Sequence, residues 1–406
     1  MQFSDRLQEK NSHCATVTDI QTVSILGATG SIGTNTLDLI ARSADRFQIE
    51  SLTAYKNVSQ LAKLAKVHNA KFAVIGDETK YKELKSYLAG TSIEIGSGET
   101  GLIEAGARQA DCTIASIIGS AGLRPSIEAV RQGHRVALAN KECLVAAGDV
   151  FMSEVSLAIA ELLPLDSEHA AIHQVLCRGM LDEVKQIIIT ASGGPFRNWT
   201  AKQITAATPE QALRHPNWSM GAKISIDSST LMNKGLELIE AHHLFAIEPE
   251  RLKVIIHPQS VVHCLISYYD GSVIAQMANP DMRTPIAYCL AWPGRMASPT
   301  EPLDLIKLQS LTFEAPDTER FPALDLAISA LIKGGSAPNI MNAANECAVA
   351  AFLAHEISFT DITRIVEKCL EKADQQNLLQ PVGTIDEVLA LDHEARQLVG
   401  RLIDQN

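Results

Sequence analysis

Short apolar runs alternate with amphipathic stretches through the first 165 residues. Consecutive apolar residues indicate buried strands, and apolar positions three and four apart indicate helices. The predicted strands are Thr22–Leu26, Phe47–Ala54, Phe72–Gly76, Cys112–Ser116, Arg135–Ala139 and Leu162–Leu165. The predicted helices pass through Leu37–Ile40, Leu61–His68, Thr79–Leu88 and Ser126–Gln132. Repeated βα units of this length predict an open parallel sheet.

The middle of the chain has a different pattern. Val184–Thr190 is a strongly apolar strand, and three further segments read as strands of an antiparallel sheet: Val254–Pro258, Val261–Tyr268 and Val273–Met277. Asp270-Gly271 is a hairpin turn between the last two. Lys223–Ile226 alternates polar and apolar residues, which predicts a short strand. Asp227–Thr230 then supplies capping side chains for a helix.

The last quarter of the chain predicts only helices. Residues 300–320 form a polar connector, and helix periodicity from about Ala323 to Leu402 predicts a small helical domain. Asn342, Asn345 and Glu346 are expected at exposed helix positions. The expected fold is therefore α/β, with a Rossmann-like domain, an α+β domain containing an antiparallel sheet, and a C-terminal helical bundle.

The predicted division of the chain has five parts. They are a flexible N-terminal extension (1–21), a dinucleotide-binding domain (22–165), a catalytic domain (166–300), a linker (301–322) and the C-terminal helical domain (323–406).

Composition and charge narrow the class of function. With 46% hydrophobic and 20% charged residues among 406, the chain can build more than one core. The net charge of −12 argues against a nucleic-acid partner, because a polyanion would be repelled. None of the eight cysteines forms a C-x-x-C pair, no apolar run reaches membrane-spanning length, and the polar N-terminus lacks the apolar core of a signal peptide. We therefore expect a reduced, cytoplasmic protein.

A glycine-rich turn lies between the first predicted strand and the helix after it. Gly27, Gly30 and Gly33 have the spacing G-x-x-G-x-x-G, in the strand–turn–helix context that a dinucleotide site requires. A tight turn without a ligand is the alternative. The second strand ends at Lys56 and Asn57 rather than at an acidic residue, which favours a 2′-phosphate and hence NADP(H). A solvated loop lysine explains Lys56 as well.

Two clusters of polar residues follow later strands. Asn140-Lys141-Glu142 lies beyond the carboxyl end of a strand, where open α/β sheets bind ligands, although a simple turn fits too. Asp166 and Glu168, two residues apart, suggest a divalent cation. With Glu237 as a third oxygen ligand the set suits Mg²⁺ or Mn²⁺ rather than zinc. The alternative is an ordinary helix start capped by Asp166 or Ser167.

A third cluster suits a phosphate. Small residues at Ser192–Gly194 offer backbone amides to an anion, and the hydroxyls after Asp227 are followed one turn later by Asn233 and Lys234. Lys234 and Glu237 share a helix face, so an exposed ion pair next to an ordinary cap explains these residues equally well.

Several segments together resemble one family. GATGSIG, ANKE, PLDSEH, SGGPFR, HPNWSMGAKISIDSSTLMNKGLELIEA, HPQS and NPDMRTPI are similar to motifs of 1-deoxy-D-xylulose 5-phosphate reductoisomerases, in the same order and at matching spacing. The resemblance runs from about residue 22 to the end. It implies an NADPH- and divalent-metal-dependent enzyme of the non-mevalonate isoprenoid pathway, and it suggests a homodimer formed through the sheet of the middle domain.

The resemblance also implies roles for single residues. Those implied to contact NADPH are Thr29, Gly30, Ser31, Ile32, Tyr55, Lys56, Asn57, Asn140, Glu142 and Gly221. Those implied to hold one Mg²⁺ or Mn²⁺ are Asp166, Glu168 and Glu237. Those implied to contact the substrate are Lys141, Ser167, Glu168, Ser192, His215, Trp218, Ser228, Asn233, Lys234, Glu237 and Met282. Catalytic roles fall to Lys141, Glu168, His215 and Glu237.

Two further features follow from the same resemblance. Residues 214–221, with His215, Trp218 and Met220, match a flap that closes over the substrate. Tyr55 stands where the family pattern has glycine, so contacts on the adenine side differ.

The implied reaction converts 1-deoxy-D-xylulose 5-phosphate into 2-C-methyl-D-erythritol 4-phosphate, by isomerisation through a carbon–carbon cleavage and recombination, followed by hydride transfer from NADPH. A metal ion would act as the Lewis acid.

Two other functions remain open at this point. A semialdehyde dehydrogenase would use Cys143 as nucleophile, and a dinucleotide-sensing protein would bind the cofactor without turnover.

Overall fold

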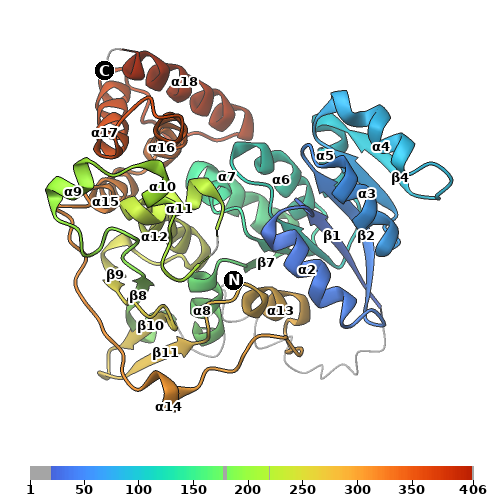
Figure 1. The fold of residues 1–406 in the computed structure, drawn as a ribbon, viewed down its shortest axis with the longest axis horizontal. Coiled ribbons are helices and arrows are strands. Elements are labelled where there is room, and N and C mark those ends of the chain that lie inside the picture. The colour runs from blue at the N-terminus through green and yellow to red at the C-terminus, as the bar shows by residue number, and fades with distance from the viewer. Residues whose placement is uncertain (1–19, 177–180, 219, 405–406) are drawn as a thin grey trace. The chain divides into compact units, whose positions relative to one another are not determined.

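The computed structural model describes residues 20–176, 181–218 and 220–404 (Figure 1). The chain forms two compact units, each made of separate segments. Unit 1 takes the chain up to Asn140, Ser153–Val184 and Asp281–Glu301. Unit 2 takes Lys141–Met152, Lys185–Pro280 and the chain from Pro302 onward. The five-part division predicted from the sequence stays a prediction, and most of its N-terminal extension lies outside the described residues.

Unit 1 contains the predicted parallel sheet. Its seven strands run in the order β4-β3-β2-β1-β5-β6-β7, and every recorded pairing is parallel. They are β1 Gln21–Leu26, β2 Phe47–Ala54, β3 Phe72–Ile75, β4 Glu94–Ser97, β5 Cys112–Ala115, β6 Arg135–Leu138 and β7 Glu161–Pro164. Strand order reverses between β1 and β5, which creates the crevice where sheets of this type bind ligands. Among the seven strands of this sheet, β4 is the one that the sequence patterns missed, because its residues are partly exposed.

Helices cover the two faces of this sheet. On one face a core of buried side chains joins the strands to helices α2 Ser31–Ala41, α3 Val58–Val67 and α13 Arg283–Ala291. On the other face Ala105 of helix α5 packs against Leu26, Phe72 and Val74. The remaining helices here are α4 Tyr81–Tyr87, α5 Gly98–Ala107, α6 Leu123–Arg131 and α8 Ser167–Leu176.

Unit 2 contains a four-stranded sheet in the order β11-β10-β8-β9. Its strands are β8 Val184–Ala191, β9 Leu252–Ile256, β10 Val262–Tyr268 and β11 Val273–Met277. The predicted hairpin is confirmed, since β10 and β11 pair antiparallel. The prediction of a purely antiparallel sheet is wrong, because β9 pairs parallel with β8 and the sheet is therefore mixed.

The helices of unit 2 correct two predictions. Lys223–Ile226 is not a strand but the first half of helix α11, where Ser229 donates to the Ser225 carbonyl one turn back and both side chains are buried. Four alternating residues are too few to separate the two periods. Asn342 and Asn345 are 1% and 0% exposed, not exposed as expected, because helix α16 is central among the C-terminal helices.

The last four helices form the predicted C-terminal bundle: α15 Ala323–Lys333, α16 Ala337–Leu353, α17 Phe359–Gln375 and α18 Ile385–Ile403. The other helices that lie wholly in unit 2 are α9 Ala201–Thr205, α10 Pro209–Ala212, α11 Ala222–Thr230, α12 Met232–Phe245 and α14 Leu305–Leu308. Helix α7 Glu142–Ala158 is divided between the units after Met152. Single 3₁₀ turns occur at Glu78–Lys80, Ser120–Gly122, Leu181–Glu183 and Pro249–Arg251. Within the described residues, no helix combines the length and the apolar character needed to cross a bilayer.

Helix α12 packs closely against α15 because position 235 is a glycine. A Cβ atom built on Gly235 would lie 2.2 Å from the Cβ of Ala327. Residues 232–241 of α12 are all buried, although they include Asn233, Lys234 and Glu237. Close packing of this helix therefore fixes three polar side chains in an interior that offers them little room to move.

Helix α8 is anchored to α13 by a buried histidine. His173 is 4% exposed, its Nδ1 lies 2.7 Å from the Tyr288 hydroxyl, and its ring packs edge-on against Trp292. Burial lowers the pKa of His173 to about 4, partly opposed by the negative charge of Glu161. The imidazole is therefore neutral in the folded protein at neutral pH.

Replacing Gly235 by alanine should destabilise the protein by about 1–3 kcal/mol, because the overpacking cost exceeds the gain of up to about 1 kcal/mol in helix propensity. The matched control is Gly400→Ala in α18, where a Cβ meets nothing within 4 Å and should stabilise by roughly 0.5–1 kcal/mol. Urea unfolding of both variants measures the difference. Equal effects of the two substitutions would contradict the close-packing account.

His173 should make the protein sensitive to acid. Its folded pKa of about 4 lies below the unfolded value of 6.5, so the unfolded chain binds a proton first as the pH falls. The contribution of neutral His173 to the free energy of unfolding is fully present above pH 6.5. It is lost as the pH falls to 4 and does not change further below that, for a total loss on the order of 3 kcal/mol. Unfolding of His173→Gln between pH 7 and pH 4 should show a shallower decline than wild type, whereas His393→Gln, at an exposed site, should follow wild type.

Candidate active site

The structure distributes the predicted site residues over both units. In unit 1 they are Thr29, Gly30, Ser31, Ile32, Tyr55, Lys56, Asn57, Asn140, Asp166, Ser167, Glu168 and Met282. In unit 2 they are Lys141, Glu142, Ser192, His215, Trp218, Met220, Gly221, Ser228, Asn233, Lys234 and Glu237.

The glycine-rich turn allows a ligand to approach the main chain of the protein closely. Gly27 adopts a φ of +96°, its amide donates to Thr53 Oγ1 at 2.9 Å, and a Cβ at Gly33 would lie 2.5 Å from the Gly27 carbonyl oxygen. Only glycine fits both positions. The start of α2 has no side-chain cap among the described residues, so its first amides are available to an anion such as a pyrophosphate.

The end of β2 carries the residues predicted to recognise the cofactor's ribose side. The ammonium of Lys56 lies 5.0 Å from the centre of the Tyr55 ring, and Tyr55 itself is 67% exposed. Asn57 Oδ1 accepts the Gln60 amide and so caps helix α3. Tyr55 therefore makes a cation–π contact with Lys56, which a glycine at position 55 could not make.

Asn140 presents a buried polar atom. Its Nδ2 donates to the Gly119 carbonyl at 2.9 Å, whereas its Oδ1, although buried, has no hydrogen-bond partner among the described residues. A buried acceptor without a partner is costly. A hydrogen-bond donor on a bound cofactor would satisfy it, so this residue fits the cofactor contact predicted for it.

The start of α8 carries two carboxylates. Asp166 and Glu168 are partly exposed, and Ser167 Oγ donates to Glu168. His169, by contrast, is 0% exposed, with its Nδ1 3.9 Å from Asp166 Oδ1. Oxygen donors at the edge of a buried region are the ligand type that Mg²⁺ and Mn²⁺ take in proteins.

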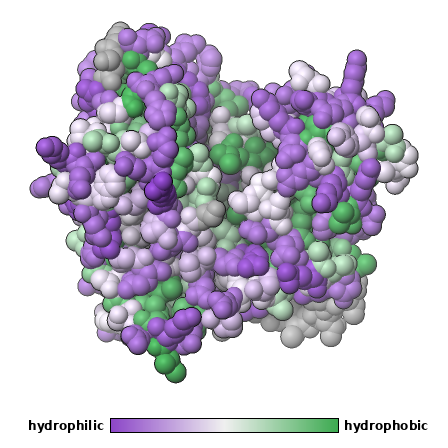
Figure 2. Space-filling model, in the orientation of Figure 1, coloured by the Kyte–Doolittle hydropathy of each residue, from purple (hydrophilic) through white to green (hydrophobic). Residues whose placement is uncertain are grey.

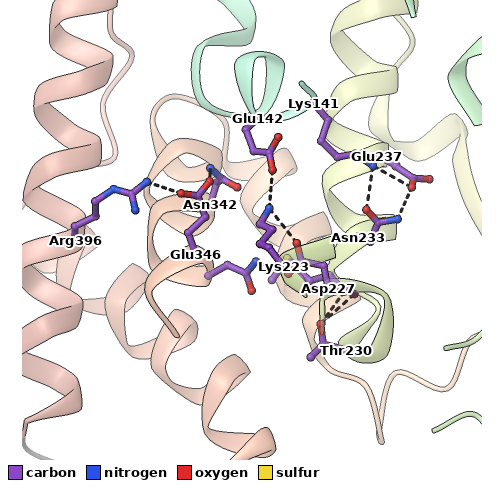
Figure 3. Close-up of polar contacts among 12 residues, drawn as sticks. Lys141, Glu142, Lys223, Asp227, Thr230, Asn233, Glu237, Asn342, Glu346 and Arg396 are labelled. Atoms are coloured by element: carbon purple, nitrogen blue, oxygen red, sulfur yellow. Dashed lines mark hydrogen bonds and ion pairs between the residues drawn. The ribbon is translucent and has the colours of Figure 1, made fainter. Parts of the chain in front are cut away.

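A buried cluster in unit 2 is centred on Glu237 (Figure 3). Lys141 Nζ lies 3.3 Å from Glu237 Oε1 and 3.0 Å from Asn233 Oδ1, and Lys234 Nζ lies 2.7 Å from Glu237 Oε2. Glu237 is 1% exposed and both lysines are below 10%. The alternative of an exposed pair is therefore wrong: Lys234 and Glu237 form a buried contact in which a second ammonium, that of Lys141, shares the carboxylate.

Two separate segments form the predicted phosphate site. Gly194, with a φ of +68°, lies so close to α11 that a Cβ would approach the Ser228 carbonyl oxygen to 2.7 Å. Leu231, in the left-handed conformation at φ +64°, ends α11 and starts α12. This bend brings the segment carrying Ser228 directly before the helix that carries Asn233 and Lys234.

The segment predicted to be a flap is joined to Ser192 by a hydrogen bond from His215. His215 Nδ1 accepts the backbone amides of Asn217 and Trp218, at 3.2 and 2.9 Å. Nδ1 is therefore unprotonated, and Nε2–H donates to Ser192 Oγ at 2.9 Å. Asn217 in turn donates to Pro258 O and Ser260 Oγ, both at 2.7 Å.

Other predicted residues have less specific surroundings. Met282 packs against the core of unit 1, and Gly221 is the N-cap of α11. Met220 is partly exposed and belongs to no helix or strand. Cys143, the nucleophile of the dehydrogenase alternative, lies inside α7 with 1% exposure and forms no disulfide among the described residues. A buried thiol of this kind is not placed to attack a substrate.

Sequence reasoning missed one group of charged residues. Lys223 forms ion pairs with Glu142 at 2.8 Å and with Asp227 at 3.0 Å. The i,i+4 spacing of Lys223 and Asp227 was a signal for this pair, but it depends on a helix where a strand was predicted. Nothing in the local sequence indicates Glu142 as a partner 81 residues away.

Three family models match the chain. The model described as 1-deoxy-D-xylulose 5-phosphate reductoisomerase matches residues 23–148, and two models of C-terminal domains of the same enzyme match residues 162–245 and 277–398. Two similar relatives carry that enzyme name. The protein from Bradyrhizobium diazoefficiens is 52% identical over 96% of both chains, and that from Nitrobacter winogradskyi is 53% identical over 95% of both.

Solved structures agree with these matches. The reductoisomerase from Zymomonas mobilis in complex with NADPH is 51% identical, with a TM-score of 0.90 over 96% of this chain and 100% of that one. A reductoisomerase in complex with NADPH, fosmidomycin and magnesium is 42% identical, with a TM-score of 0.91 over 95% of this chain and 98% of that one. On this sequence identity, coverage and shared fold, the chain belongs to the 1-deoxy-D-xylulose 5-phosphate reductoisomerase family.

Proposed function

We propose that this protein is an NADPH- and divalent-metal-dependent enzyme that isomerises and reduces 1-deoxy-D-xylulose 5-phosphate to 2-C-methyl-D-erythritol 4-phosphate. The observation that carries the proposal is the buried cluster of Lys141, Asn233, Lys234 and Glu237, preceded in the chain by the Ser228 segment. Membership of the family supports the reaction, and its relatives bear the name of that enzyme.

The cofactor and metal residues stay those proposed from the sequence. The turn from Thr29 to Ile32 would hold the NADPH pyrophosphate and Lys56 and Asn57 the 2′-phosphate. Asn140 and Glu142 would make further contacts with the cofactor. The proposed metal ligands are Asp166, Glu168 and Glu237, an all-oxygen set suited to Mg²⁺ or Mn²⁺. When bound, the metal supplies Lewis acidity at the substrate's oxygens and NADPH supplies the hydride.

Residues of unit 2 do the work of binding the substrate phosphate. Ser192 and Ser228 offer hydroxyls, and Asn233 and Lys234 an amide and an ammonium, which together suit a dianion. Because Lys141 and Lys234 face one carboxylate, the local charge is positive although the protein carries −12 overall. An acidic protein can therefore attract an anionic substrate at this point.

Lys141 and the flap act on the reacting part of the substrate. Lys141, 5% exposed and hydrogen-bonded to Asn233, holds a positive charge where negative charge develops on oxygen during the isomerisation. His215 fixes the backbone of Trp218 through its Nδ1 acceptor, so the indole is placed to exclude water and retain the fragments.

Turnover should depend on Glu237. The assay follows NADPH absorbance with 1-deoxy-D-xylulose 5-phosphate and Mg²⁺. Wild type should turn over and stop when excess EDTA is added. Glu237→Gln should lose at least about 100-fold in kcat, because it loses a metal ligand and the charge that pairs two lysines. NADPH binding, measured by fluorescence, should change less than about two-fold.

A matched control tests whether a buried carboxylate in general is needed. Asp392 is 6% exposed and pairs with Arg396 on α18. Asp392→Asn should keep kcat within about two-fold of wild type. Tight NADPH binding by wild type without any turnover would refute the reaction, and a Glu237→Gln variant with wild-type kcat would refute the metal assignment.

We further propose that two copies pair through the edge of the sheet in unit 2. Strand β11 is an edge strand, and Val273 and Ile274 on it are 53% and 49% exposed. Leu305 and Ile306 of α14 are 61% and 89% exposed. Figure 2 shows hydrophobic residues at the lower edge of the view, where Figure 1 draws β11 and α14. An unpaired apolar edge of this kind invites a second copy.

We also propose that the protein resides in a reducing compartment. None of the six cysteines among the described residues forms a disulfide, and burial raises the pKa of Cys112 to about 11. Unreactive, reduced thiols are consistent with a cytoplasmic protein.

Charge on β11 should separate the two copies. Ile274→Asp places a carboxylate in the proposed contact and should weaken association by about 100-fold or more, since an unpaired charge buried at an interface is costly. Size-exclusion chromatography with light scattering gives the mass. Leu157→Asp, a substitution at a residue 79% exposed in unit 1, is the control and should leave the mass unchanged. A monomeric wild type would contradict the proposed pairing.

A further inference from the structure

Lys223, in the first turn of helix α11, forms an ion pair with the first residue of helix α7 and another with Asp227 within its own helix (Figure 3). Its ammonium lies 2.8 Å from Glu142 Oε1 and 3.0 Å from Asp227 Oδ2. Glu142 is the first residue of α7 and directly follows Lys141, and Asp227 directly precedes Ser228 on α11. Lys223 therefore contacts the chain neighbour of Lys141 and the chain neighbour of Ser228. Lys141 and Ser228 are both proposed to contact the substrate.

The two carboxylates are buried and depend on this ammonium. The Asp227 side chain is 1% exposed and the Glu142 side chain 9%, against 21% for Lys223. Burial alone would raise the pKa of Glu142, yet the charge and hydrogen bond of Lys223 hold it below its ordinary value. Without the lysine, two buried negative charges would face each other.

Helix stability does not explain why a lysine stands here. Lys223 lies in the first turn of α11, where the helix dipole disfavours a cation, and no acidic residue in that turn offsets it. Buried ion pairs are also often no more stabilising than apolar residues of similar volume. The arrangement is better explained by where it holds the two helices than by a gain in stability.

A second contact fixes Asp227 from the C-terminal helices. Asn345 of α16, 0% exposed, donates from Nδ2 to Asp227 Oδ1 at 2.7 Å. The amide must face this way, because a carboxylate can only accept. The position of α11 is thus set jointly by α7 and by the C-terminal helices.

We propose that Lys223 is a positioning residue of the active site: together with Asn345 it clamps Glu142 and Asp227, and so sets the places of Lys141 and Ser228. The proposal rests on the function proposed above for those two residues. It gives the C-terminal helices a part in the reaction, because Asn345 of α16 holds Asp227 in place. No residue of α16 is itself predicted to contact the substrate.

The consequence for the substrate has two parts. A shift of Glu142 moves the Lys141 ammonium relative to Glu237 and Asn233, which lowers the rate of the chemical step. A shift of Asp227 moves the Ser228 hydroxyl, which weakens phosphate binding. Displacements of about 1 Å at a reacting centre can cost on the order of 100-fold in rate.

The experiment uses the intact enzyme with NADPH and Mg²⁺, below the unfolding temperature of every variant. Lys223→Met should lower kcat about 10- to 100-fold. It should also weaken inorganic phosphate binding, measured calorimetrically without substrate, by up to about ten-fold. Lys223→Arg keeps the charge and the donors and should recover most of both losses. Asn345→Ser removes only the bond to Asp227 and should give a smaller loss in the same direction.

Arg396→Met is the matched control for a purely structural effect. Arg396 pairs with Glu346 and Asp392 in the same region, yet it contacts neither Glu142 nor Asp227 in any recorded interaction. It should lower the unfolding temperature while the folded variant keeps wild-type kcat within about two-fold.

The outcomes separate this proposal from the proposed function. A wild type that binds phosphate but does not turn over would refute the reaction, and the phosphate affinities of the variants would still decide the clamp. Folded Lys223→Met with wild-type kcat and phosphate affinity would overturn the clamp. Equal losses in Arg396→Met would overturn it too. If Lys223→Met does not fold, unchanged kcat and phosphate affinity in Asn345→Ser have the same meaning.

Discussion

Unit 2 depends on the pairing of charges that it buries. Glu237 lies on a helix with almost no solvent access, and it is tolerated there because Lys141 and Lys234 both contact it. Removing one partner from such a cluster typically costs about 3–5 kcal/mol. The backbone must therefore hold three segments, around 141, 223–234 and 345, in register with one another. The close approach at Gly235 and the left-handed Leu231 serve this requirement.

The parts of the fold that the sequence predicted are those with local causes. The strands of unit 1 are short apolar runs with turns on either side, and the turn from Gly27 to Gly33 is identifiable because no Cβ fits at either of these two glycines. The hairpin between β10 and β11 follows from Asp270-Gly271. Candidate site residues were found in the same way, as polar residues that directly follow apolar strands, such as Asn140 and Asp166.

The errors have a common physical origin in contacts between distant residues. Helix propensity and alternation conflict over Lys223–Ile226, and the helix prevails because its side chains find partners on α7, α10 and within α11. Asn345 reads as an exposed position in any local pattern, yet it is buried because its partner is a carboxylate 118 residues earlier. The parallel pairing of β9 with β8 likewise reflects a connection of sixty residues rather than any property of the strand itself.

Charge balance links the two buried clusters of unit 2. Around Glu237, two ammonium groups face one carboxylate, which leaves a positive excess beside the hydroxyls of Ser192 and Ser228. Around Lys223, two carboxylates face one ammonium, which leaves a negative excess. The first cluster can gain electrostatic energy from an anion, whereas the second would repel one. The balance of charge therefore favours an anion on the Lys141–Lys234 side over the Lys223 side.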